Sequence, residues 1–162
     1  MGDASDFAAW YAGARPRVLA TLTLVTGDAH RAAEATDEAF LRALSRWSAV
    51  SRMGSPVGWT VRVGINVVRR RERRARMEAR LLRREVPRGD VPPAAGEAWA
   101  AVAQLPPRQR EVLVLRYVGD LTDAEIARAL GVSRSAVSSA LTDGRRALAT
   151  LLDEPHPEVR HV

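Results

Sequence analysis

Two groups of side chains in this sequence have the chemistry to bind a polyanion. The first is a basic stretch, because residues 62–88 hold eleven Arg and three Glu and carry the whole positive excess of a chain whose net charge is +6. The second is a polar segment near the C-terminus, where Arg134 stands among several hydroxyl side chains. Guanidinium and hydroxyl groups hydrogen-bond to phosphates and base edges. The pattern predicts nucleic-acid binding, and the alternative for the basic stretch is a solvated, charged linker.

The sequence shows none of the motifs that would predict an enzyme. We find no P-loop, no glycine-rich dinucleotide turn, no nucleophile elbow and no His-Glu metal motif. The chain has no cysteine, which excludes disulfides, thiolate zinc sites and a cysteine nucleophile. Of the histidines His30, His156 and His161, the last two lie in a proline-rich tail for which we expect disorder. We therefore expect no catalytic residue, no metal, no cofactor and no small-molecule substrate.

Composition describes an ordinary soluble protein of 162 residues, with 46% apolar and 27% charged residues. No apolar run approaches the roughly 18 residues that a membrane span needs. The N-terminal residues, MGDASDFAAWY, carry acids where a signal peptide has a basic start. We expect a cytoplasmic protein that does not interact with a membrane.

The proline and glycine residues divide the chain into two parts. The richest stretch of this kind, residues 87–93, is typical of a linker between domains. We predict an all-α protein with two small helical domains, at 1–76 and 97–153, joined by a linker at 77–96 and followed by a tail at 154–162. Limited proteolysis is expected to begin in the linker.

In the first part, residues 5–26 have a helical pattern that Pro16 should break or bend near Arg15. Asp28 is placed to cap the next helix, because its carboxylate can accept a hydrogen bond from a free amide of the first turn. Farther along, Phe40, Leu44 and Trp47 have the spacing of one buried helix face.

Residues 57–67 fit two structures. Apolar residues alternate strictly with Gly58, Thr60, Arg62, Gly64 and Asn66, which is a strand pattern. Against it, the preceding Ser-Pro pair is a favourable helix start, and the segment runs without a breaker into the arginine-rich stretch. A single strand would also have no partner. We predict a helix.

The second part carries the clearest local signals. A helix opens at Pro106-Pro107 with Val112, Leu113 and Leu115 as apolar residues. Thr122 and Glu125 have the spacing of a capping box at the start of the next helix.

That short helix ends at Gly131, and Ser133 caps the following helix, whose inner stripe is Val137, Leu141 and Leu148. Two helices across a tight glycine turn predict a helix-turn-helix, with a plain αα-hairpin as the alternative. The outer face of the second helix would enter a major groove with base-reading residues, followed by two arginines for phosphate. These residues are Arg134, Ser135, Ser138, Ser139, Thr142, Arg145 and Arg146.

From its opening LPPRQREVLVLRY through DLTDAEIARALGVS to the trailing RRAL, the second part closely resembles region 4 of bacterial RNA polymerase sigma factors of the extracytoplasmic-function (ECF) type. The first part resembles region 2 through TGDAHRAAEATDEAFLRALSRW and SPVGWTVRVGINVVRRRERR. The resemblance implies a protein that binds core RNA polymerase and promoter DNA and directs transcription initiation. It also admits an anti-sigma factor as a partner.

By the same resemblance, three sets of residues acquire roles. The −35 element would meet the outer face of the second helix of the helix-turn-helix. Polymerase docking would involve Glu34, Asp37, Glu38 and Arg42. The −10 element would contact Trp59, Arg62, Asn66, Arg69, Arg70 and Arg73.

Several alternatives stay open at the level of the sequence. Trp59 has apolar neighbours and is as well explained as a core residue, and the acids of the docking set as a solvated helix face. The family often has Gln where Asp37 stands, and Lys or Arg near Ser138 or Ser139, so docking and −35 preference would both be altered. Two other functions remain possible: a stand-alone helix-turn-helix regulator, and a sigma-like interaction protein without initiation activity.

Overall fold

The computed structural model describes residues 2–82 and 96–153, and within these ranges the chain forms helices and no strand. The all-α prediction is confirmed. The helices are α1 (Gly2–Thr26), α2 (Ala29–Ser45), α3 (Trp47–Val50), α4 (Pro56–Leu82), α5 (Gly96–Gln104), α6 (Pro107–Tyr117), α7 (Asp123–Leu130) and α8 (Arg134–Asp153).

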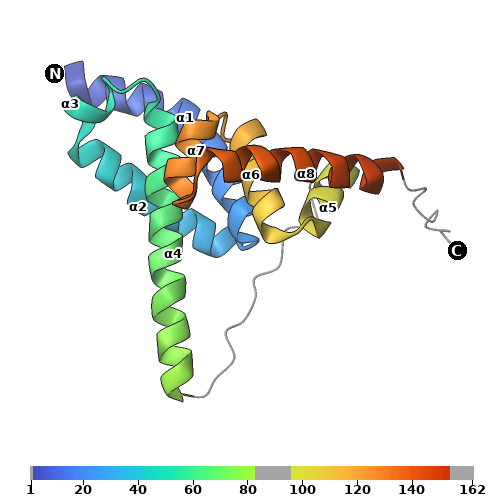
Figure 1. The fold of residues 1–162 in the computed structure, drawn as a ribbon. Helices are drawn as coiled ribbons and strands as arrows, with labels where there is room; N and C mark the ends of the chain where they lie inside the picture. The colour runs from blue at the N-terminus through green and yellow to red at the C-terminus, as the bar shows by residue number, and fades with distance from the viewer. Residues whose placement is uncertain (1, 83–95, 154–162) are drawn as a thin grey trace, which may run out of the picture.

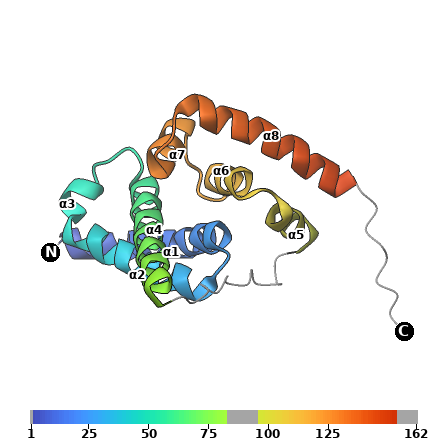
Figure 2. The same ribbon diagram turned by 60° about the horizontal axis from the view of Figure 1, so that its bottom comes forward.

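The helices form two groups that lie against each other. Figure 2 shows α1–α4 on one side and α5–α8 on the other, with α4 and α7 meeting between them. A single hydrophobic cluster runs through both groups, because Leu22 and Ile65 of the first share it with Leu115, Leu121 and Ile126 of the second. The two halves therefore have a common core in this arrangement.

Helix α4 is longer than the predicted first domain. It continues to Leu82, so 77–82 of the expected linker are helical, and its last turns project beyond the other helices in Figure 1. The rest of the expected linker up to residue 95, and the expected tail at 154–162 with His156 and His161, lie outside the described residues. Helices α3 and α5 are elements that the sequence analysis did not predict.

Helix α1 is continuous through Pro16, so a break into two helices near Arg15 is wrong, and the alternative of a bend there stays a prediction. Proline removes one backbone hydrogen bond and strains one turn, at a cost of about 3 kcal/mol in a helix interior. Ala14, Val18 and Leu22, on both sides of this turn, are buried in the core. Packing of these side chains against α2 and α4 offsets that cost.

Helix α2 begins as predicted but buries a different face. The Asp28 carboxylate accepts a hydrogen bond from the Arg31 amide at 2.9 Å, which confirms the predicted cap. Phe40 and Trp47 are buried, whereas Leu44 is 48% exposed, so its predicted burial is wrong. The helix ends at Ser45, and Trp47 lies in the separate α3, so the three residues do not share one helical face.

The ambiguous segment at 57–67 is helical, as predicted. Ser55 Oγ accepts a hydrogen bond from the Gly58 amide at 3.0 Å, and Pro56 is the first helical residue. Val61, Ile65 and Val68, at spacings of four and three, are buried on one side. The strand-like alternation arose because apolar residues also occupy positions off this face, such as the half-buried Val63.

The predicted helix-turn-helix elements are present. The capping box at α7 is complete, with Glu125 N donating to Thr122 Oγ1 at 3.3 Å and Thr122 N donating to Glu125 Oε2 at 2.8 Å. Gly131 ends α7 with φ of 68°, a left-handed conformation that favours glycine. The Ser133 hydroxyl accepts a hydrogen bond from the Ala136 amide at 3.1 Å and caps α8.

Candidate nucleic-acid interface

One stripe of α4 collects most of the residues expected at the −10 element. Their spacing of three or four residues places them on a single helix face. Arg62, Asn66 and Arg73 are exposed and make no side-chain hydrogen bond or ion pair with any described residue. Trp59 is half-buried at the start of the stripe, so it is neither a full core residue nor fully open to solvent. The α4 stripe consists of Trp59, Arg62, Asn66, Arg69 and Arg73.

Arg69, in the middle of the α4 stripe, contacts the other half of the protein. Its Nη1 donates to the carbonyl oxygens of Ala129 at 3.2 Å and Leu130 at 3.0 Å, at the C-terminal end of α7. Carbonyls at a helix end have no partner within the helix and carry partial negative charge, so a guanidinium there is favourable. Nη2 also lies 4.0 Å from Glu111 of α6. In this arrangement Arg69 is engaged within the protein.

A second contact joins α1 to the turn after α6. Arg17 Nε donates to the Val118 carbonyl at 3.0 Å, and its Nη2 forms an ion pair with Asp120 at 3.0 Å. Both the Arg17 and the Asp120 side chains are substantially exposed, so the ion pair itself adds little stability. Together with the Arg69 contact, it forms a second polar connection between the two halves.

The acids expected to dock polymerase form ion pairs with arginines of the same chain. Glu38 accepts hydrogen bonds from Arg70 at 2.8 Å and Arg71 at 3.1 Å, and it also pairs with Arg42 of its own helix. Glu34 accepts from Arg71 at 2.6 Å. The structure thus brings Arg70, expected at the −10 element, onto α2 beside two residues of the docking set.

Asp37 faces α1 rather than α4. It accepts a hydrogen bond from Arg15 at 3.0 Å, and this bond is the main cause that raises the pKa of the Arg15 guanidinium above its usual value. Beside it, Leu41 is 66% exposed and borders a groove of about 480 Å³ lined by side chains of α1 and α2. The groove is lined by Phe7, Tyr11, Arg15, Asp37, Phe40, Leu41 and Leu44.

The predicted recognition face of α8 is open to solvent. All of its members are exposed: Arg134, Ser135, Ser138, Ser139, Thr142, Arg145 and Arg146. The inner side of the same helix buries Val137 and Leu141 against the remaining helices of its group. The helix therefore separates an apolar inner face from a polar outer face, as a recognition helix must.

One residue of this face is held by a partner that sequence analysis missed. Arg145 Nε donates to the Tyr117 hydroxyl at 2.8 Å, and its guanidinium lies 5.8 Å from the centre of the Tyr117 ring. Tyr117 ends α6 and is 61% exposed. The aromatic residue Tyr117 near the end of a predicted helix was the available signal, but its contact with α8 depends on how the helices pack.

Other kinds of site find little support within residues 2–82 and 96–153. No group of three or more His, Asp or Glu side chains there has the arrangement of a metal site. His30 lies 3.5 Å from Glu34 in an exposed pair. In the same ranges no helix has the length and apolar character that crossing a membrane would require.

The fold and the helix-turn-helix place the chain among helical DNA-binding proteins, and comparison with known proteins identifies the family. The family model for sigma-70, region 4, matches residues 95–148. The ECF RNA polymerase sigma factor SigK of Mycobacterium bovis is 30% identical, over 93% of this chain and 88% of SigK. The chain therefore belongs to the ECF RNA polymerase sigma factors, which direct RNA polymerase in transcription initiation.

Further relatives agree with this assignment. The ECF RNA polymerase sigma factor BldN of Streptomyces coelicolor is 28% identical over 94% of this chain, which spans 62% of the length of BldN. Among solved structures, the sigma factor RpoE of Bartonella quintana in complex with the anti-sigma factor NepR superposes with a TM-score of 0.75 at 18% identity, over 93% of this chain and 99% of RpoE. CnrH in complex with the cytosolic domain of CnrY has a TM-score of 0.59 at 21% identity, over 96% of this chain and 92% of CnrH. These structures share the fold.

Proposed function

We propose that this chain joins core RNA polymerase in the cytoplasm and directs it to promoters with two DNA-binding surfaces, without a catalytic site of its own. The α4 stripe would hold the −10 element and the outer face of α8 would read the −35 element. The observation that carries the proposal is the 30% identity to an ECF sigma factor that extends over nearly the whole chain. Arg62 and Arg73 of the stripe, which are exposed and have no partner among the described residues, and the exposed polar face of α8 support it.

The chemistry of the α4 stripe suits a separated DNA strand. Binding of single strands needs positive charge for the phosphates and flat side chains for the bases. Arg62 and Arg73 supply the charge, and the half-buried Trp59 supplies a ring with an accessible part. Arg69 would join them only after leaving the carbonyls of α7, and Arg70 only after leaving Glu38.

Docking on polymerase is proposed for the outer side of α2. The earlier set of Glu34, Asp37, Glu38 and Arg42 is joined there by Leu41 and Leu44, which are exposed apolar residues beside Asp37. Exposed leucines next to a groove are typical of a protein interface. Replacing both leucines with alanine should weaken binding to core polymerase at least tenfold, whereas Leu152→Ala, an exposed leucine on α8, should not. Equal loss in both variants would exclude this surface.

A regulatory partner is part of the proposal. RpoE, whose fold this chain shares, is known in complex with the anti-sigma factor NepR. We propose that an anti-sigma factor of corresponding type binds this chain as well.

The deciding experiment is run-off transcription with the purified chain, core polymerase and genomic fragments. A sigma factor produces specific transcripts only when core polymerase is present. A stand-alone regulator would bind duplex DNA by itself, and an interaction protein without initiation activity would bind polymerase yet produce no transcript. Either of these two results would replace the proposed function.

A further inference from the structure

Helix α7 lies along the N-terminal half of α4, which carries most of the α4 stripe. At one end of this contact, a Cβ added to Gly58 would lie 3.1 Å from Glu125 Oε1. At the other end, about three helical turns farther along α4, Arg69 donates to the Leu130 carbonyl at 3.0 Å. The first helix of the helix-turn-helix is therefore packed beside the surface proposed for DNA.

The end of α7 occupies the guanidinium of Arg69. The carbonyl oxygens of Ala129 and Leu130 accept from Nη1 at 3.2 and 3.0 Å. Carbonyls at a helix end carry partial negative charge and lack partners within the helix. A DNA phosphate is likewise a negative acceptor that binds guanidinium groups. The two carbonyls thus take the place on Arg69 that a phosphate would need.

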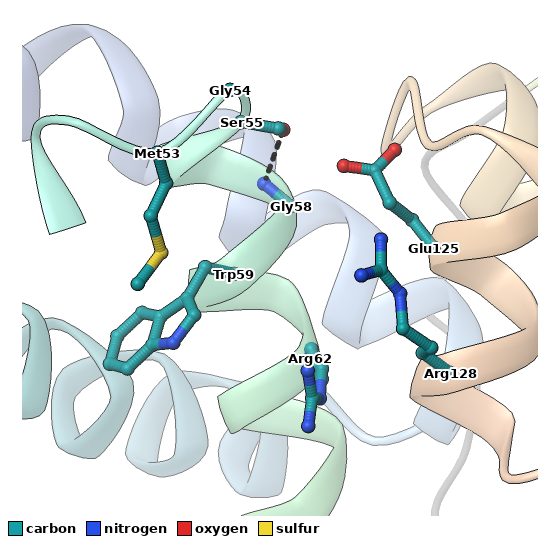
Figure 3. A pocket seen from close by; sticks show the side chains of 8 residues that line it. All are labelled: Met53, Gly54, Ser55, Gly58, Trp59, Arg62, Glu125 and Arg128. Carbon is teal, nitrogen blue, oxygen red and sulfur yellow. Dashed lines mark hydrogen bonds between the residues drawn. The ribbon is translucent and has the colours of Figure 1, made fainter.

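Nearer the start of α4, α7 forms the far wall of a cavity of about 520 Å³. Figure 3 shows Trp59 and Arg62 on one side of it and Glu125 and Arg128 on the other. Small molecules fill cavities of about 300–1,000 Å³, whereas a DNA strand continues on both sides of each base and needs an open groove. Glu125 Oε2 accepts from the Thr122 amide at 2.8 Å, which holds a carboxylate at this wall where it would repel phosphates.

Contacts just before α7 hold the helix in this position. Arg17 of α1 donates to the Val118 carbonyl at 3.0 Å and forms an ion pair with Asp120 at 3.0 Å. The next residue, Leu121, is buried in the core that both halves share. Since α7 begins at Asp123, these contacts keep its first turn close to α4. The closed arrangement is made by residues of this chain alone.

We propose that α7 is an internal competitor of DNA: in the closed arrangement it inhibits the α4 stripe, and the halves must separate before the stripe holds a DNA strand. The inference rests on the proposed −10 role of the stripe and gives the helix-turn-helix half a second task. The affinity of the free chain for a strand is then reduced by the fraction of molecules that are open. The outer face of α8 is exposed in the closed arrangement and is not inhibited in this way.

The experiment locks the closed arrangement at the Arg17–Asp120 ion pair. The sequence contains no lysine, so Arg17→Lys introduces a single lysine side chain. A water-soluble carbodiimide joins the amine of this lysine to the Asp120 carboxylate as an amide and takes up the water that is released. The bridge removes one positive and one negative charge, so the net charge stays the same. Mass spectrometry of the linked peptides identifies the bridged protein.

The measurement is the fluorescence anisotropy of a labelled single-stranded oligodeoxythymidylate, titrated with the full chain at low ionic strength and without polymerase. Bridging should weaken binding at least tenfold, because it removes the open molecules. The matched control is Arg17→Lys combined with Asp120→Asn and treated with the same carbodiimide. It undergoes the same modification of other carboxylates but cannot form the bridge, and it should bind at least as tightly as untreated protein.

Two single variants test the same idea without chemical treatment. Arg17→Gln and Asp120→Asn change the net charge in opposite directions, yet each removes the ion pair and should strengthen binding of the oligonucleotide by up to about threefold. Asparagine also suits the left-handed backbone of Asp120, whose φ is 56°.

Three results would overturn the proposal: equal binding by the bridged protein and its control, no binding by either, or opposite effects of the two single variants, which would show that net charge alone decides. None of these measurements uses polymerase. Run-off transcription by the unmodified chain tests the sigma-factor function separately, so the two can fail independently.

Discussion

Arg69 of α4 and Leu130 of α7, 61 residues apart in the chain, are joined by a 3.0 Å hydrogen bond from the guanidinium to the backbone carbonyl. The bond places an arginine expected at the −10 element on the end of the helix-turn-helix's first helix. While Nη1 of Arg69 donates to the two α7 carbonyls, it cannot also donate to a DNA phosphate. The arrangement of the two halves and the use of the α4 stripe are therefore coupled.

We predict that Arg69→Ala loosens the contact between the halves. Loss of hydrogen bonds from a charged donor that is about one-third exposed should cost on the order of 1 kcal/mol, or about a fivefold shift toward separated halves. The chain has no cysteine, so dyes can be placed at Ala8→Cys on α1 and Ala149→Cys on α8, both exposed positions. Single-molecule energy transfer should show more of the low-transfer population in Arg69→Ala.

The control for this measurement is Arg73→Ala, which removes an exposed arginine of the same stripe without a partner among the described residues. It should leave the distance distribution unchanged. If Arg69→Ala has no more effect than Arg73→Ala, then the Arg69 bond does not hold the halves together.

A second prediction concerns Gly58, where the start of α4 lies close to the side chains of Leu121 and Glu125. Gly58→Ala should destabilise the protein by about 0.5–2 kcal/mol net, because the added methyl group would meet Ser55 Oγ at 2.7 Å and Leu121 Cδ2 at 2.9 Å, which outweighs the gain of alanine in a helix. Gly13→Ala is the matched control, since nothing lies within 4 Å of its added Cβ and alanine favours the helix by about 0.5–1 kcal/mol. Urea unfolding should show opposite shifts of the midpoint. Two equal stabilisations would mean that the α4–α7 contact is looser than described.

A third prediction distinguishes the residues of α8 that recognise DNA bases from those that bind the phosphate backbone. Arg134→Ala, at the start of the helix, should cost about 1–3 kcal/mol on the preferred −35 sequence and relax preference at one or two base pairs. Selection from a randomised −35 library with reconstituted holoenzyme measures this. Should the variant keep the parental preference at every position, base reading lies with the serines or with DNA shape.

A fourth prediction follows from the bond between Tyr117 and Arg145. Tyr117→Phe removes the hydroxyl that accepts from Arg145 Nε and should weaken binding to all −35 sequences alike, by up to about threefold, because the arginine loses its fixed position. Arg145→Ala should weaken them further and also reduce the salt dependence of binding, since one phosphate contact is lost. Filter binding over a range of salt concentrations distinguishes the two. A change of sequence preference in Tyr117→Phe would contradict the role of Tyr117 in positioning Arg145 on a phosphate.

A fifth prediction concerns limited proteolysis and whether the two fragments stay together through their shared hydrophobic core. The proline- and glycine-rich sequence at 87–93 should be the first site of limited proteolysis. Because both halves contribute to one hydrophobic cluster, the two fragments should then elute together in size-exclusion chromatography. Fragments that separate without denaturant would show that the common core does not persist in solution, and first cleavage within 105–150 would contradict an independent C-terminal fold.

The sequence predicted those features, such as helix caps and helix ends, that depend on residues close together along the chain. The caps at Asp28, Thr122 and Ser133 and the helix end at Gly131 depend on contacts over three or four residues, and each is present as predicted. The helix over 57–67 followed from its Ser-Pro start. The exposed face of α8 agrees with its predicted polar stripe, because a regular helix fixes which residues share a face.

Tertiary structure decided the features that depend on what each helix packs against. The sequence placed Arg69 among DNA-facing residues, yet its partner is the end of a helix 60 residues away, and no local pattern encodes that distance. Pro16 stays inside α1 because buried neighbours offset its cost, and Leu44 is exposed although it lies one turn after the buried Phe40 in α2. Local hydrogen bonds are determined by residues close in sequence, whereas burial and long-range partners are determined by the packing of whole helices, and that packing appears only in the folded chain.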